Sequence, residues 1–244
     1  ALLANYSLHY VGGFPAISAD YFGAFAESIG VLLDADRSFV GIMSNGTSGD
    51  VNNANFAGMA PGKREPGEQI RIVANSVAKA AQKAVANIKY KNHVSLASEQ
   101  KELLLGVRQP SKSELEKANE ILTKANKTVL DTMTEIYARE TVLLSKYPSQ
   151  VPAIIQVIRI GDLGICAIPC EVFTEIGLEL KKRSPLKQTF TISLANGYNG
   201  YLPTPQQHKL GGYETWRARS SYLETEASVK ITSTLMGLLE KVKK

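Results

Sequence analysis

Two apolar, β-prone runs at residues 153–160 and 163–168 constrain the fold of this chain more than any other feature. They flank Gly161-Asp162, a pair typical of tight turns, so together they predict a β-hairpin. Four more β-prone runs lie at 2–8, 39–43, 93–105 and 190–194. Helical patterns cover 19–33, 67–88 and 222–242. Because strands and helices mix without strict alternation, we expect an α/β fold, that is, a mixed α+β layered domain with a mixed sheet packed against helices.

A long helical pattern follows Pro110 and continues to about Tyr147, where Pro148 would end it. Its apolar positions recur at helical spacing, and its charged positions are most simply a solvated face. Ser111-x-x-Glu114 and Ser113-x-x-Glu116 both have the spacing of a capping box, so either can start the helix. The sequence therefore predicts one long helix around 111–147.

Charge and hydropathy argue against two classes of function. The net charge of +5 is modest, and much of the excess lies on one predicted helix and at the end of the chain, which favours a solvated basic face over a nucleic-acid groove. No apolar run reaches the ~18 residues of a membrane span, so no transmembrane segment is expected. The only two cysteines, Cys166 and Cys170, are expected to be structural, with a single disulfide as the alternative.

The chain opens on Ala1, without Met, in a segment that already has the character of a strand. We therefore expect residues 1–244 to be the later part of a longer protein.

Residues 57–67 contain two Pro and three Gly and predict a loop. The small polar residues at 44–53 predict another loop, and because no Gly-Lys-Ser/Thr follows Gly46-Thr-Ser-Gly49, a phosphate-binding loop is disfavoured.

Only three histidines are present, which limits the chemistry available. His9 follows a predicted strand and precedes a flexible turn, and strand ends are where sites are often built. It is either a metal ligand or a hydrogen-bonded core or loop residue. His93 and His208 lie in polar surroundings and are expected at the surface.

Glu171 follows an apolar strand and Pro169, in a predicted turn that opens a helix reaching about Arg183. At the first helical turn, its carboxylate either complements the helix dipole or projects from the strand–helix junction as a metal ligand. Tyr198, Tyr201 and Tyr213 lie in Gly-rich loops. Tyrosines in such loops either cover the core or present a phenol to a ligand.

Four sequence blocks, in order, resemble motifs of the neutral/alkaline (non-lysosomal) ceramidase family. Asn5-Tyr-Ser-Leu-His9 resembles the strand that ends in a zinc-binding His, and Gly49-Asp-Val51 resembles the core of the serine motif. Pro169-Cys-Glu171-Val-Phe-Thr174 resembles the segment that supplies a zinc-binding Glu. Asn196-Gly-Tyr198-Asn-Gly-Tyr201, followed by Tyr213-Glu214, resembles the tyrosine block.

The resemblance implies that His9, Glu171 and Tyr201 bind Zn²⁺ and that Tyr213 stabilises an oxyanion. It also implies hydrolysis of an N-acyl amide, as in ceramide, to sphingosine and a fatty acid, and a secreted or periplasmic location. The family's upstream zinc-binding His and proton-transferring His have no counterpart here. The family's motif serine falls at Asn52, whose amide can hydrogen-bond a substrate or a metal-bound water but cannot act as a hydroxyl nucleophile.

The leading hypothesis is thus a zinc-dependent amidohydrolase that acts on a lipid or another N-acyl amide. Its expected partners are this small-molecule substrate and the N-terminal part of the same protein, which would complete the site. One alternative is a non-catalytic lipid- or carbohydrate-binding relative that keeps the fold. Another is a hydrolase of a different bond, such as an ester.

Overall fold

The structure is a computed structural model that describes residues 1–13, 15, 17–55, 58, 62 and 64–243. Strands are β1 (Leu2–Tyr6), β2 (Gly41–Asn45), β3 (Leu96–Gly106), β4 (Gln150–Ile160), β5 (Leu163–Ile168), β6 (Glu171–Val172), β7 (Gln188–Ser193) and β8 (Tyr201–Leu202). Helices are α1 (Asp20–Leu32), α2 (Glu68–Val85), α3 (Lys112–Ala125), α4 (Met133–Leu144), α5 (Thr174–Arg183), α6 (Pro205–Leu210) and α7 (Ala227–Lys243), with a 3₁₀ turn at Tyr213–Thr215.

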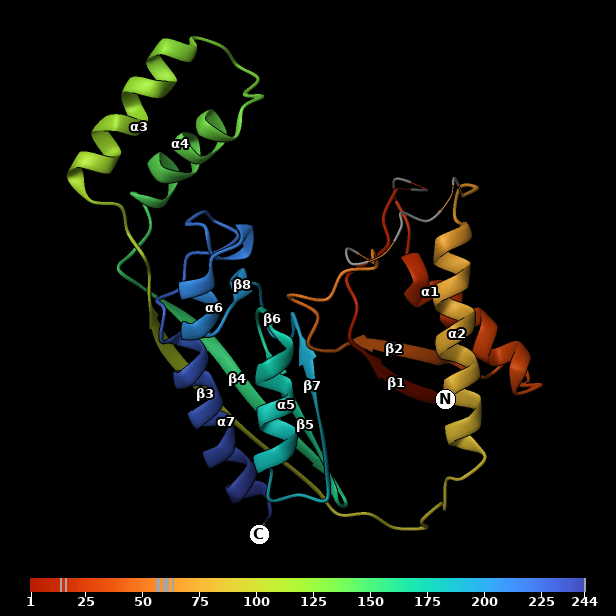
Figure 1. Cartoon of the computed structure of the whole chain (residues 1–244). Coiled ribbons are helices and arrows are strands. Elements are labelled where there is room, and N and C mark those ends of the chain that lie inside the picture. Colours follow the sequence, from red (N-terminus) through yellow and green to blue (C-terminus); the bar gives the residue numbers. More distant parts are fainter. Residues whose placement is uncertain (14, 16, 56–57, 59–61, 63, 244) are drawn as a thin grey trace.

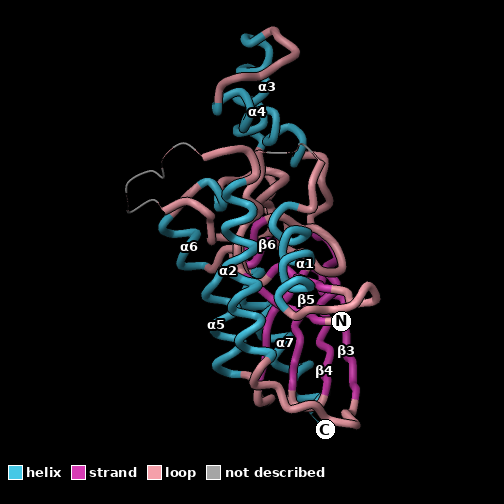
Figure 2. Tube along the Cα trace, turned by 90° about the vertical axis from the view of Figure 1, so that its right-hand side faces the viewer, coloured by secondary structure: helices cyan, strands magenta, loops and turns pink. Residues whose placement is uncertain are grey.

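The largest sheet has the order β3-β4-β5-β7. Its first two pairings are antiparallel, with β4 and β5 forming the predicted hairpin around Gly161-Asp162, while β5 and β7 are parallel. Helices α5 and α7 pack against this sheet (Figures 1 and 2). Inward-facing residues of β4, such as Ile155 and Val157, are fully buried with Ile231 and Leu235 of α7. The predicted mixed α/β fold is confirmed.

A second, smaller layer forms from β1, β2, α1 and α2 (Figure 1). Strands β1 and β2 pair in parallel, and α1 packs its buried residues Tyr21, Phe25 and Ile29 against α2. The side-chain amide of Asn5 on β1 donates to the carbonyl of Thr191 on β7 at 3.0 Å. The end of β1 is thereby tied to the larger sheet.

The single long helix predicted around 111–147 is wrong. Two helices, α3 and α4, occupy this region and form a hairpin that extends away from the sheets (Figure 1). Helix α3 ends because Asn126 adopts a left-handed conformation with φ 43°, and α4 starts at its own capping box formed by Thr132 and Glu135. The predicted capping box of Ser111 with Glu114 is confirmed at the start of α3.

Three further expectations concern the cysteines, the loop at 57–67 and membrane spans. Cys166 and Cys170 are free and buried, as the structural interpretation predicted, and burial raises the pKa of the Cys166 thiol to about 12. Part of the loop predicted at 57–67 lies outside the described residues. Among the helices of the described residues, none has both the length and the apolar character needed to cross a membrane.

Candidate functional site

A two-residue parallel ladder places two candidate ligands side by side. Glu171 opens β6 and is the register partner of Tyr201, the first residue of β8. The backbone N–H of Glu171 donates to the carbonyl of Gly200 at 2.9 Å. Gly200 has φ +73°, and a Cβ there would lie 2.4 Å from the carbonyl oxygen of Ser220, so only glycine fits this turn.

The predicted position of Glu171 in the first turn of a helix is wrong. Helix α5 begins at Thr174, three residues later, and Glu171 lies on strand β6 instead. The strand ladder with Tyr201 holds its backbone extended, which a helical turn would not allow. The helix-dipole interpretation therefore does not apply, because Glu171 precedes the helix.

His9 reaches the same place from the second, smaller layer, which contains β1. It lies three residues beyond β1, where its backbone N–H donates to the carbonyl of Val51 at 2.9 Å. Its ring Nδ1 lies 3.2 Å from the same carbonyl oxygen. This contact fixes the ring and leaves Nε2 directed at the other candidates.

The three candidate donors converge. His9 Nε2 lies 3.2 Å from Glu171 Oε2 and 3.4 Å from the hydroxyl of Tyr201. The hydrogen bond to Glu171 is the main reason that the pKa of His9 is raised above its ordinary value. Burial, with further contributions from Tyr213 and Glu171, raises the pKa of Tyr201. The imidazole, the carboxylate and the phenol thus meet around His9 Nε2.

Two more tyrosines border the cluster. The hydroxyl of Tyr198 donates to Glu171 Oε1 at 3.1 Å, which leaves Oε2 for His9. Tyr213 packs edge-on against Tyr201 with ring centroids 5.8 Å apart, and 48% of its surface is exposed. Tyr213 thus borders the cluster through Tyr201 and is half-exposed.

The segment Gly49-Asp-Val51 holds the cluster together. Gly49 donates its N–H to the carbonyl of Val172 on β6 at 2.8 Å, and a Cβ on Gly49 would lie 2.5 Å from the carbonyl oxygen of Glu171. Asp50 Oδ1 accepts from both the backbone N–H and the hydroxyl of Thr174, each at 2.8 Å, and so caps α5. Sequence reasoning missed this capping role, because the partners lie 124 residues apart.

Asn52, the remaining predicted site residue, is exposed, and its side-chain oxygen accepts from the backbone N–H of Asn53. No contact joins its side chain to His9, Glu171 or Tyr201 among the described residues. His93 is exposed, as predicted. The surface position predicted for His208 is wrong, because this residue of α6 is half-buried. Burial lowers the pKa of its imidazole.

The donor chemistry of the cluster fits zinc. Imidazole nitrogen and carboxylate oxygen are common zinc ligands, and the Val51 carbonyl opposite His9 Nδ1 resembles the backbone partners that orient such ligands. Within the described part of the chain, no group of three or more His, Cys, Asp and Glu is placed to hold a metal, because the third donor here is a tyrosine. The chain therefore offers three donors, and their role as ligands stays a prediction.

Comparisons with known proteins support the resemblance at the level of the fold. No family model matches the sequence, and no curated protein matches it significantly. The crystal structure of neutral ceramidase from Pseudomonas aeruginosa is similar over 96% of this chain, with a TM-score of 0.67 and 16% identity. A structure of ceramidase complexed with C2 is similar over 98% of the chain, with a TM-score of 0.68 and 14% identity.

The matched regions cover only 43% and 45% of those two chains. The fold of this chain is thus that of part of a neutral ceramidase, and the chain spans less than half the length of the structures it resembles. This likeness is confined to the fold, since both identities are low.

Proposed function

We propose that this chain forms part of a zinc-dependent amidohydrolase that cleaves the N-acyl amide bond of a ceramide-like lipid. The observation that carries the proposal is the convergence of His9 Nε2, Glu171 Oε2 and the Tyr201 hydroxyl, donors that come from three separate parts of the sequence. The ceramidase-like fold supports the same reaction class.

His9, Glu171 and Tyr201 would hold the metal. A bound zinc ion supplies a Lewis acid and a water of lowered pKa to such a site. The chain's own residues then orient the reactants: Tyr198 fixes the carboxylate of Glu171, and Val51 fixes the ring of His9.

Tyr213 would donate its phenolic hydrogen bond to the amide carbonyl oxygen as that oxygen gains negative charge. Water adds across the C–N bond, so the acyl carbon keeps the hydroxyl as a fatty acid and the nitrogen leaves with a proton as the free amine. Asn52 would contribute a hydrogen bond to the substrate at most, because its amide is not a nucleophile.

A complete site would need a fourth ligand and a group that transfers protons to the amine. In the described part of the chain, neither His93 nor His208 contacts the cluster. We propose that another segment of the same protein, lying before residue 1, supplies these groups, and that the protein acts in a secreted or periplasmic location.

The natural protein, loaded with zinc, should release free fatty acid and free amine from an N-acyl sphingosine in equal amounts, measured by mass spectrometry. Tyr213→Phe should lower kcat by about 10²-fold or more, since it removes one oxyanion donor. Tyr90→Phe, at an exposed tyrosine outside the cluster, is the matched control and should have the wild-type rate. Equal rates for the Tyr213 variant and the wild type would contradict the proposal.

A non-catalytic lipid-binding relative is the second candidate, and one observation favours it. The exposed Asn52 stands where the family has its motif serine, and its side chain makes no contact with the three donors. Zinc-loaded protein that binds N-acyl amides without turning over amide or ester substrates would support this candidate. Turnover of the ester alone would support an esterase.

A further inference from the structure

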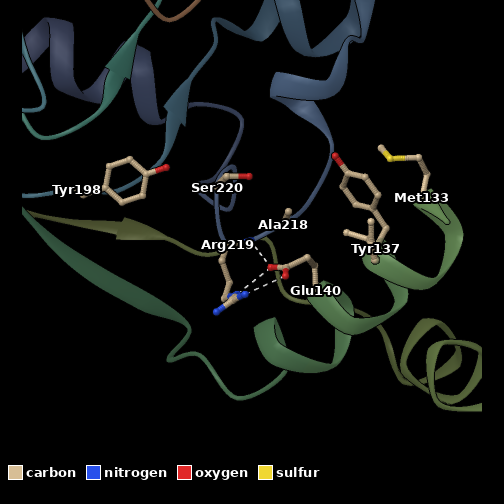
Figure 3. Close-up of a pocket in the computed structure, with 8 residues that line it drawn as sticks. Met133, Tyr137, Glu140, Tyr198, Ala218, Arg219 and Ser220 are labelled. Carbon is tan, nitrogen blue, oxygen red and sulfur yellow. Dashed lines mark hydrogen bonds and ion pairs between the residues drawn. The ribbon is translucent and has the colours of Figure 1, made fainter. Parts of the chain in front are cut away.

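A cavity of about 410 Å³ lies between α4 and the segment 218–220. We name it the arm cavity. It is lined by Met133, Ile136, Tyr137, Glu140, Tyr198, Ala218, Arg219 and Ser220. Figure 3 shows Met133 and Tyr137 on one side of it, Tyr198 on the other, and Glu140 with Arg219 between them.

The wall that α4 contributes is mainly apolar. Met133 is 55% exposed although it is a large hydrophobic residue, and Ile136 and the ring of Tyr137 continue the same helix face. An unbranched thioether beside aliphatic and aromatic surface adapts to flexible apolar ligands. This wall therefore suits a hydrocarbon chain.

The charges that line the arm cavity are already paired. Glu140 Oε2 accepts from Arg219 Nε at 2.8 Å, and Oε1 accepts from Arg219 Nη2 at 2.9 Å (Figure 3). The backbone N–H of Arg219 also donates to Glu140 at 3.2 Å. A charged head group inside the cavity would compete with this paired geometry, so the favoured occupant is the uncharged hydrocarbon part of an amphiphile, with its head group outside.

The arm cavity is also adjacent to the donor cluster. Tyr198 lines the cavity and donates its hydroxyl to Glu171 at 3.1 Å. Ser220 also lines the cavity, and its backbone carbonyl accepts a hydrogen bond from the backbone N–H of Tyr201 at 2.8 Å. The cavity is thus linked to Glu171 through the side chain of Tyr198, and to Tyr201 through the backbone carbonyl of Ser220.

The base of the helical hairpin is fastened beside the cavity. Arg217 pairs with Glu114 of α3 at 2.8 Å, and Trp216 packs edge-on against Tyr137 of α4 with ring centroids 5.3 Å apart. The segment that carries Tyr213 therefore also positions the apolar wall.

We propose that the arm cavity binds an aliphatic chain of the amide substrate, and that Met133 and Ile136 determine which chains are accepted. This inference rests on the proposed function for the identity of the substrate, whereas the binding itself needs neither zinc nor turnover. The acyl chain and the chain of the amine product share the same chemistry, so both are tested.

Dodecanoic acid and dodecylamine, each below its micelle concentration, are titrated calorimetrically into zinc-free natural protein. The wild type should bind at least one of them. Ile136→Trp, which fills the cavity, and Met133→Glu, which charges its wall at a half-exposed position, should each weaken that binding at least tenfold. Val129→Trp, on the same helical hairpin but outside the cavity lining, should bind within twofold of the wild type.

Binding that both cavity variants leave unchanged, or wild-type protein that binds neither amphiphile, would overturn the proposal. Met133→Glu keeps the test decisive if Ile136→Trp fails to fold, because Met133 is not part of a buried core. Variant-sensitive chain binding without amide hydrolysis would refute the proposed function and leave the arm cavity standing. Amide hydrolysis together with chain binding that the cavity variants do not weaken would support the proposed function and refute the arm-cavity proposal.

Discussion

Replacing Gly49 by alanine tests whether close backbone contact holds the candidate ligands in place. The new Cβ would lie 2.5 Å from the carbonyl oxygen of Glu171 and 2.9 Å from the ring of Phe173. An ordinary contact begins near 3.4 Å, so the loop and β6 must separate by about 0.9 Å. Two backbone segments cannot move apart as easily as the flexible end of a side chain can move away.

The expected cost is about 1–3 kcal/mol in the free energy of unfolding, the usual range for overpacking a filled site. Because the displaced strand carries Glu171, zinc affinity should also fall by about 10- to 100-fold, as when an outer partner of a ligand is lost. Urea denaturation of zinc-free protein measures the first quantity, and chelator competition measures the second.

Gly237→Ala is the matched control, since this exposed glycine of α7 has no atom within 4 Å of its added Cβ. It should leave zinc affinity unchanged and raise stability by up to about 1 kcal/mol through helix propensity. A Gly49→Ala protein with wild-type stability and wild-type zinc affinity would refute the role assigned to this contact.

Two further perturbations test neighbouring contacts. Tyr198→Phe removes the hydroxyl that orients Glu171 and should weaken zinc binding by about 10- to 100-fold, with no further loss when Glu171 is already alanine; additive losses would contradict a role through Glu171. Glu140→Gln should cost about 1 kcal/mol of unfolding free energy at neutral pH, a value reduced by the exposure of Arg219. Arg219 lowers the pKa of Glu140 in the folded state. The difference in unfolding free energy between the wild type and the variant should therefore be fully present above pH 4.5, the ordinary pKa of this carboxyl, and should disappear as the pH falls through the lowered pKa. A difference that is independent of pH between 6 and 2 would contradict the ion pair's contribution.

The sequence predicted those parts of the fold that depend on local patterns. The hairpin at Gly161-Asp162 and the capping box at Ser111 formed as expected, because turn and cap preferences act over a few residues. The break between α3 and α4 had a comparable local signal in Thr132-x-x-Glu135. Continued helical spacing across that break concealed it.

The candidate site was accessible from sequence only through the family resemblance. His9 and Glu171 are 162 residues apart, and no periodicity relates them. The helical position expected for Glu171 failed because its strand pairing with Tyr201 is a tertiary contact that overrides local preference. The capping of α5 by Asp50 and the orientation of Glu171 by Tyr198 are likewise contacts between segments distant in sequence.

Anomalous diffraction at the zinc edge, from crystals of the natural protein grown with zinc, tests the central claim most directly. The account predicts one strong peak about 2.0–2.2 Å from His9 Nε2 and a carboxylate oxygen of Glu171, and within bonding reach of the Tyr201 hydroxyl. A zinc peak bound elsewhere, with these three side chains left uncoordinated, would contradict it.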